Sequence, residues 1–195
     1  IDVIAVSNNS LTNLPNKFFH SFDFSNENLF KKIKSKIFNK SSIDKEIINL
    51  CLDNSEDKSN LKYKIYKVEH HLAHIASAYY LSDFKNRTAG LSYDGSGDAV
   101  SIMLAECNNT EIKVLERVYL PKSLGHFYSA VCNYIGFEKF GEEYKVMGLS
   151  AYGEDKYSDH FNDLIGYDEK FCLRQKNIFD YNSIDYKKNQ VIKFN

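Results

Sequence analysis

The chain has 195 residues, 43% hydrophobic and 26% charged, enough to bury the core of one globular domain. Its 25 basic and 26 acidic residues leave a net charge of −1, which excludes recruitment of nucleic acid or of a membrane by charge alone. No apolar run approaches the roughly 18 residues of a membrane span, and no signal-peptide pattern opens the chain, so we predict a cytoplasmic protein. The cysteines are widely spaced and form no C-x-x-C pair, which argues against a zinc ribbon or a dense disulfide framework; they are Cys51, Cys107, Cys132 and Cys172.

The first sixty residues predict a strand followed by a polar insertion. Residues 1–6 carry apolar side chains on both faces, which predicts a buried, central strand. Residues 16–60 are rich in Asn, Lys and Ser and contain two short helical patterns, so we predict a helical insertion there. We expect a single domain, with a motif-bearing core at 61–165 and a tail segment at 166–195. Because the chain opens inside an apolar stretch without Met, we also expect a fragment of a longer protein.

A helix carrying two histidines is predicted directly after a strand. Residues 63–68 alternate in polarity, and helical periodicity follows from His70. His70 and His74 are four residues apart, so a helix projects both imidazoles from one face, where they can bind one ion, while His71 points elsewhere. A zincin site is excluded because position 71 lacks the required Glu.

A glycine-rich turn is predicted next. A strand at 89–93 ends in Asp94-Gly95-Ser96-Gly97-Asp98, where the two glycines permit a tight turn with exposed backbone N–H groups. Such a turn can hold phosphate, and Asp94 can bind metal. Structural roles are the alternative, since Asp-Gly is a common hairpin signal and helical histidines are often half-buried side chains.

The following elements predict a meander and a helix. A strand at 99–106 pairs back on the preceding one with the 94–98 loop as the hairpin tip, and a third strand covers 112–120. Helical periodicity then spans 123–137 and ends at Gly136. It carries His126, whose role by itself is open between structural and functional. Periodicity alone permits either an α/β or an α+β fold.

The segment 140–153 is dense in glycine and aromatic residues at irregular spacing, and we predict neither a strand nor a helix there. Within it, Glu143 and Lys145 can pair with each other or contact an acceptor sugar and a phosphate. A short helix is predicted at 159–167, with a strand near 171–173 and a turn near 178–181.

Four motifs in order resemble the NodU/CmcH family of O-carbamoyltransferases. They are HHLAHIASAYY from His70, DGSG from Asp94, SLGHFYSAV from Ser123 and EYKVMGLSAYG from Glu143. The resemblance covers roughly residues 60–165. It implies an α/β fold, the ribonuclease-H-like half-domain of an actin-like ATPase (ASKHA, Kae1-like) fold, with a mixed sheet and flanking helices. It also implies a divalent metal bound by His70, His74 and Asp94, with iron preferred over manganese or zinc.

The resemblance further implies a reaction. The family transfers a carbamoyl group from carbamoyl adenylate, made from carbamoyl phosphate and ATP, to a hydroxyl of a sugar or secondary metabolite. Asp94, Gly95, Ser96 and Gly97 would then bind the adenylate, with His126, Glu143 and Lys145 as the catalytic candidates. A YrdC-like domain and a second lobe would be supplied by the rest of the parent protein. A non-catalytic nucleotide- or metal-binding module and a Kae1-type tRNA threonylcarbamoyl transferase remain the alternatives.

Overall fold

The computed structural model describes residues 3–9, 11–16, 64–84, 86–139, 141–167, 173–175, 179–180 and 193–194. We predicted a helical insertion at residues 16–60, and residues 17–60 of it lie outside this described part. The chain divides into two compact units. The first comprises Ile1–Ser92, Gly97–Ala99 and Leu104–Leu115, and the second comprises Tyr93–Ser96, Val100–Met103 and Glu116–Asn195. Within the described residues, no helix is long and apolar enough to cross a membrane.

The first unit opens with two parallel strands, β1 (Val3–Val6) and β2 (Lys64–Lys67). The predicted strand at the start of the chain is confirmed, but its buried, central position is wrong. In β1 only Ile4 is buried, and Val3 is 54% exposed. The reason is that β1 and β2 form a two-stranded sheet in the described part of the chain, so that much of their apolar surface stays open.

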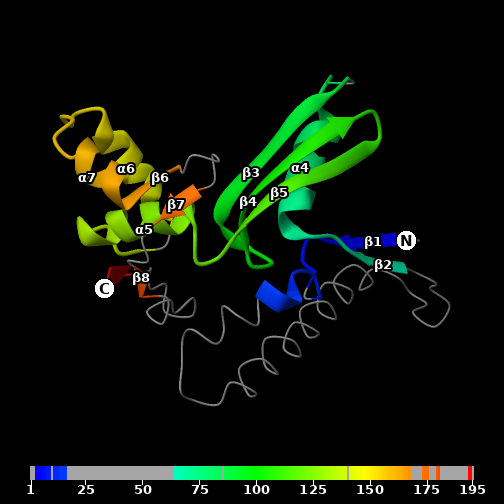
Figure 1. Cartoon of the computed structure of the whole chain (residues 1–195), viewed down its shortest axis with the longest axis horizontal. Helices are drawn as coiled ribbons and strands as arrows, with labels where there is room; N and C mark the ends of the chain where they lie inside the picture. Colours follow the sequence, from blue (N-terminus) through cyan, green and yellow to red (C-terminus); the bar gives the residue numbers. More distant parts are fainter. Residues whose placement is uncertain are drawn as a thin grey trace, which may run out of the picture. The chain divides into compact units, whose positions relative to one another are not determined.

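Helix α4 (His70–Leu81) follows β2 after two residues and confirms the predicted helix. Its buried side chains recur every four residues, as expected for one helical face, and are His71, Ile75 and Tyr79. Gly90 makes room for this face, because a Cβ there would lie 2.7 Å from Cγ2 of Ile75. Figure 1 shows α4, in teal, beside the strand that carries Gly90.

A three-stranded sheet forms the centre of the motif-bearing region. Strands β3 (Thr88–Gly97), β4 (Val100–Asn108) and β5 (Glu111–Tyr119) are ordered β3-β4-β5, which confirms the predicted meander. Every second residue of β4 is fully buried, the alternation expected when one face of a strand lies on a core. These residues are Ser101, Met103, Ala105 and Cys107.

The turn between β3 and β4 differs from the prediction. The expected tip at residues 94–98 is wrong, because β3 continues through Gly97 and the turn consists of Asp98 and Ala99. Both turn residues have positive φ, 54° and 68°. Two consecutive left-handed residues give the two-residue hairpin turn whose twist matches that of the flanking strands. Asp94 therefore lies within a strand.

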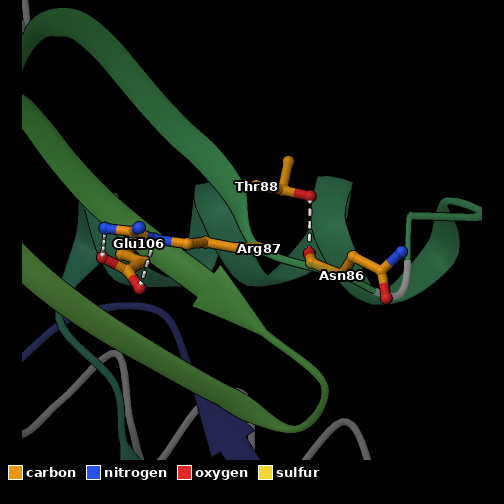
Figure 2. A network of polar contacts seen from close by, with 4 residues as sticks. All are labelled: Asn86, Arg87, Thr88 and Glu106. Atoms are coloured by element: carbon orange, nitrogen blue, oxygen red, sulfur yellow. Dashed lines mark hydrogen bonds and ion pairs between the residues drawn. The ribbon is translucent and has the colours of Figure 1, made fainter.

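Figure 2 shows a polar network at the start of β3. The Arg87 guanidinium donates two hydrogen bonds to the Glu106 carboxylate, Nε to Oε1 at 2.9 Å and Nη2 to Oε2 at 3.1 Å. Beside it, Thr88 Oγ1 donates to the carbonyl oxygen of Asn86 at 2.8 Å. Because the Arg87 side chain is 79% exposed, this ion pair contributes about 1 kcal/mol or less to stability.

In the second unit, helix α5 (Leu124–Tyr134) confirms the predicted helix, although it ends three residues before the predicted limit at residue 137. The N-cap residue Ser123 accepts a hydrogen bond through Oγ from the His126 N–H at 3.0 Å. Gly136, with φ of 100°, follows the helix and allows its left-handed ending.

The next segment corrects the sequence-based expectation. Residues predicted to be irregular form helix α6 (Glu143–Ser150). Gly148 has no atom near the position of a Cβ, so it marks no close approach there. The remaining residues of α6 are mostly ordinary helix formers, and Glu143 in the first turn suits the helix dipole. The predicted helix at 159–167 is shorter, since α7 (Ser158–Leu164) is followed by strand β6 (Ile165–Tyr167).

Short strands complete the described chain. Strand β6 pairs antiparallel with β7 (Leu173–Gln175), which shares only Leu173 with the strand expected near 171–173. Strand β8 (Phe179–Asp180) pairs antiparallel with β9 (Lys193–Phe194). Parallel and antiparallel sheets with flanking helices therefore make this a mixed α/β fold, as predicted and as expected of a ribonuclease-H-like half-domain.

Candidate functional site

The two histidines of α4 lie one helical turn apart and face each other. Their Nε2 atoms are 3.0 Å apart, and their ring centroids are 4.6 Å apart in an edge-on arrangement. Metal–imidazole bonds of about 2.0–2.1 Å at ordinary coordination angles place two ligand nitrogens about 3.0–3.4 Å from each other. His74 is exposed and His70 is half-buried. The pair therefore has the spacing of two ligands to one ion.

Asp94 is the third predicted metal ligand. His70, His74 and Asp94 each offer one ligand atom, and these atoms all lie within 4.8 Å of one another. The Asp94 carboxylate is exposed, and its Oδ1 also accepts the N–H of Gly95 at 2.6 Å. Two imidazoles and one carboxylate form a donor set that suits iron, manganese or zinc.

His71 is completely buried and lies outside this group of candidate ligands, as the sequence predicted, although its ring centroid is 5.5 Å from that of His70. Its Nδ1 makes a hydrogen bond of 2.9 Å with Oγ of Ser92, which is also buried. Ser92 stands on β3, so this bond fixes α4 against that strand. Sequence analysis named neither residue as part of the site, because a hydrogen bond across 21 positions leaves no local pattern.

The segment Asp94–Gly97 does not form the open turn that the sequence predicted. A Cβ at Gly97 would overlap the His70 ring, and a Cβ at Gly95 would lie 3.1 Å from Nε2 and Cδ2 of His126. Both glycines thus permit an imidazole to approach the strand backbone. The expected exposed loop of N–H groups is wrong, because these residues belong to β3.

His126 is buried at the N-terminal turn of α5 and is held beside Gly95 by Ser123. Ser123 Oγ donates to the carbonyl oxygen of Gly95 at 2.7 Å and accepts the N–H of His126. Gly125 allows the start of α5 to approach the Gly95 backbone closely, since a Cβ at position 125 would lie 2.6 Å from the Gly95 nitrogen. The start of α5 is therefore packed on the backbone that follows Asp94.

Glu143 and Lys145 do not pair with each other. Glu143 accepts a hydrogen bond from Ser129 Oγ at 2.8 Å, whereas Lys145 Nζ donates to Glu142 Oε1 at 2.6 Å. This hydrogen bond is the largest cause of a lowered pKa for Glu142 and of a raised pKa for Lys145. Burial raises the pKa of the Cys132 thiol, and the nearby Glu143 carboxylate raises it further.

Comparison with known proteins decides the family. The model of the carbamoyltransferase N-terminus matches residues 20–194, which is most of the chain. The chain belongs to this family. The resemblance to NodU/CmcH-type carbamoyltransferases that the four motifs indicated is thereby confirmed, and the match extends well beyond residues 60–165.

Relatives of this carbamoyltransferase N-terminal domain are longer proteins. The chain is 42% identical over 91 residues to the nodulation protein NolNO of Sinorhizobium fredii, covering 47% of the chain and 13% of that protein. It is 38% identical over 95 residues to the nodulation protein NolO of Bradyrhizobium diazoefficiens, covering 48% and 17%. An uncharacterized protein of Synechocystis is 34% identical over 127 residues, covering 65% and 20%. The matched part of the chain thus spans about a fifth or less of these three relatives.

The carbamoyltransferase N-terminal domain also contains an acidic residue that sequence analysis did not select. Asp98 is buried, and its Oδ2 accepts the backbone N–H of His70 at 3.0 Å. In the sequence, only its position at the end of the DGSGD motif could have pointed to Asp98. Its φ of 54° and its hydrogen bond to α4 depend on residues far away in the chain.

Proposed function

We propose that this chain forms part of an O-carbamoyltransferase. Its reaction would transfer a carbamoyl group from carbamoyl adenylate, made from carbamoyl phosphate and ATP, to a hydroxyl of a sugar or secondary metabolite. The family match over residues 20–194 carries the reaction class. The four motifs and the paired imidazoles of α4 support the more specific assignment.

His70, His74 and Asp94 are the proposed ligands of a divalent metal, iron first and manganese or zinc as alternatives. The spacing of their donor atoms supports this role. When bound, such an ion supplies Lewis-acid stabilisation of negative charge on a phosphate or carbamoyl oxygen. Each imidazole must present a deprotonated Nε2 to the ion, so both rings would carry their proton on Nδ1.

The adenylate phosphate is proposed to lie along Asp94, Gly95, Ser96 and Gly97. The DGSG motif supports this assignment. The space beside the two glycines is occupied by the His70 and His126 rings, so a phosphate here would contact these imidazoles. His126 beside Gly95 adds an imidazole that can donate a hydrogen bond to a phosphate oxygen. Lys145 is proposed as a phosphate contact, although it must then share its ammonium with Glu142.

The proposed transfer exchanges one bond at the carbamoyl carbon for another. The acceptor oxygen forms a bond to the carbamoyl carbon, the bond from that carbon to the adenylate oxygen breaks, and AMP leaves with the electron pair. The hydroxyl proton passes to a general base. His126 and Glu143 are both candidates, because one offers an imidazole and the other a half-buried carboxylate held by Ser129.

The experiment measures transfer of radiolabel from carbamoyl phosphate to a panel of sugars by the full-length protein, with and without ATP. A labelled sugar that forms only with ATP is the expected product. The double variant His70→Ala/His74→Ala should abolish it, whereas His160→Ala, which changes an exposed histidine of α7, should leave it unchanged. The same assay with transfer RNA in place of the sugars tests the Kae1-type alternative. Binding of metal and ATP without any labelled product would instead favour a non-catalytic module.

A further inference from the structure

The turn between β3 and β4 holds the first turn of α4 through a buried carboxylate. Asp98 is 8% exposed, and a single oxygen, Oδ2, accepts two backbone N–H groups. One comes from His70 at 3.0 Å and the other from Asn9, beyond the end of β1, at 2.9 Å. Hydrogen bonds from N–H groups to a carboxylate are stronger than neutral ones, and a negative charge at a helix N-terminus is favoured by the helix dipole.

Asn13 also stabilises the turn and the start of α4, through two hydrogen bonds. Asn13 donates through Nδ2 to Oε1 of Glu69 at 3.0 Å and to the carbonyl oxygen of Asp98 at 3.2 Å. Glu69 is the N-cap residue of α4, yet its side chain makes no capping hydrogen bond. Asp98, 28 positions away from His70, therefore does what a local cap usually does for the first helical N–H group.

The same turn also touches the His70 side chain. Gly97 precedes Asp98, and its missing side chain leaves the space that the His70 imidazole occupies. Adjacent residues thus fix His70 twice: Asp98 holds its backbone nitrogen, and Gly97 bounds its ring. Because His70 is the first residue of α4, these contacts set where its Nε2 lies relative to that of His74.

We infer that Asp98 is a positioning residue for the His70–His74 pair. The inference rests on the proposed metal-binding role of that pair. Asp98 is not itself a ligand in this assignment, since among the described residues the donor atoms that gather with those of His70 and His74 come from Asp94. Residues that orient metal ligands typically change affinity by about 10–100-fold when they are replaced. A residue that only stabilised the fold would lower the melting temperature and leave the affinity of the folded protein unchanged.

The test titrates the full chain with Co²⁺ and follows its absorption bands, alongside Asp98→Asn and Asp98→Ala. Asp98→Asn keeps the shape of the side chain and a neutral acceptor, so it should weaken Co²⁺ binding by about tenfold. Asp98→Ala removes the acceptor and should weaken Co²⁺ binding by up to about 100-fold. Asp83→Asn is the matched control, because it makes the same change at an exposed residue just beyond the other end of α4. It should bind Co²⁺ like the parent.

A metal-free measurement separates this inference from the proposed function. The ¹⁵N chemical shifts of the imidazoles report the Nε2–Nε2 hydrogen bond of His70 and His74, with His160 as an internal reference. The Asp98 variants should shift the resonances of the pair and not those of His160. If the parent binds no Co²⁺, the metal role fails, and the imidazole shifts alone decide the positioning role. Unchanged shifts, or Asp98 variants that bind Co²⁺ as tightly as the parent, would overturn it.

Discussion

The imidazole of His70 lies against the backbone of Gly97, in the space that any larger residue would fill. A Cβ at position 97 would overlap the ring and lie 2.6 Å from Cβ of His70. The overlap is with the root of the side chain, so rotation of the ring cannot relieve it. We expect Gly97→Ala to displace His70, to destabilise the fold by about 1–3 kcal/mol, and to weaken metal binding about tenfold or more.

Chemical denaturation and metal titration of the same samples measure both effects. Gly148→Ala is the matched control, since no atom lies within 4 Å of a Cβ placed there. Within helix α6 this replacement should stabilise by up to about 1 kcal/mol, because Ala has the higher helix propensity. Equal metal affinity in Gly97→Ala and Gly148→Ala would show that the close contact does not govern the histidine pair.

The histidine pair predicts a specific stabilisation by metal. A ligand that binds only the folded state at 100 times its dissociation constant raises the free energy of unfolding by about 2.7 kcal/mol. We expect Zn²⁺ or Mn²⁺ to raise the melting temperature of the parent chain and not that of His74→Gln. Chelator should reverse the shift, which differential scanning fluorimetry can follow.

Replacement of an exposed histidine elsewhere provides the control for that shift. His160→Gln lies on α7 and keeps His70, His74 and Asp94 intact, so it should respond to metal like the parent. A shift in His74→Gln as large as the parental one would mean that the metal binds elsewhere.

How far the sequence predicts this fold depends on how local each interaction is. Helix α4 and the paired imidazoles were predictable, because the spacing of His70 and His74 by itself places both rings on one helical face. The order of β3, β4 and β5 was predictable for a similar reason, since consecutive strands joined by short turns usually pair. The identity of the family followed from the motifs, and the family match confirms it.

Features that depend on distant partners were not predictable. The turn at Asp98 and Ala99 puts an alanine at positive φ, which no turn preference suggests. Asp98 occupies its conformation while it binds N–H groups from two other segments. Likewise, the exposure of β1 depends on how many strands join it, and an apolar sequence does not encode that number.

The buried pair of His71 and Ser92 predicts a stability effect without loss of the site residues. Ser92→Ala removes the 2.9 Å hydrogen bond to Nδ1 of a completely buried imidazole, which should cost about 1–3 kcal/mol. Urea denaturation measures this loss. Ser150→Ala removes an exposed hydroxyl that donates to Met147, so its effect should stay within about 0.5 kcal/mol. Equal stability of the two variants would mean that α4 is not held to β3 through this bond.

The ion pair at the start of α6 predicts a pH dependence with a definite sign. The hydrogen bond from Lys145 lowers the pKa of Glu142 below 4.5, with help from the Lys139 N–H. A carboxyl group with a lowered pKa stabilises the folded state above its unfolded pKa, and this contribution disappears as the pH falls through the folded value. Glu142→Gln should therefore be slightly less stable than the parent at pH 7 and indistinguishable from it well below pH 4.5. Urea midpoints measured from pH 3 to pH 7 for both proteins provide the check, and a gap that widens toward acid would contradict the assignment. Lys145, whose pKa is raised above 10.5 by the same bond, contributes at neutral pH and loses this contribution only as the pH rises through that raised value.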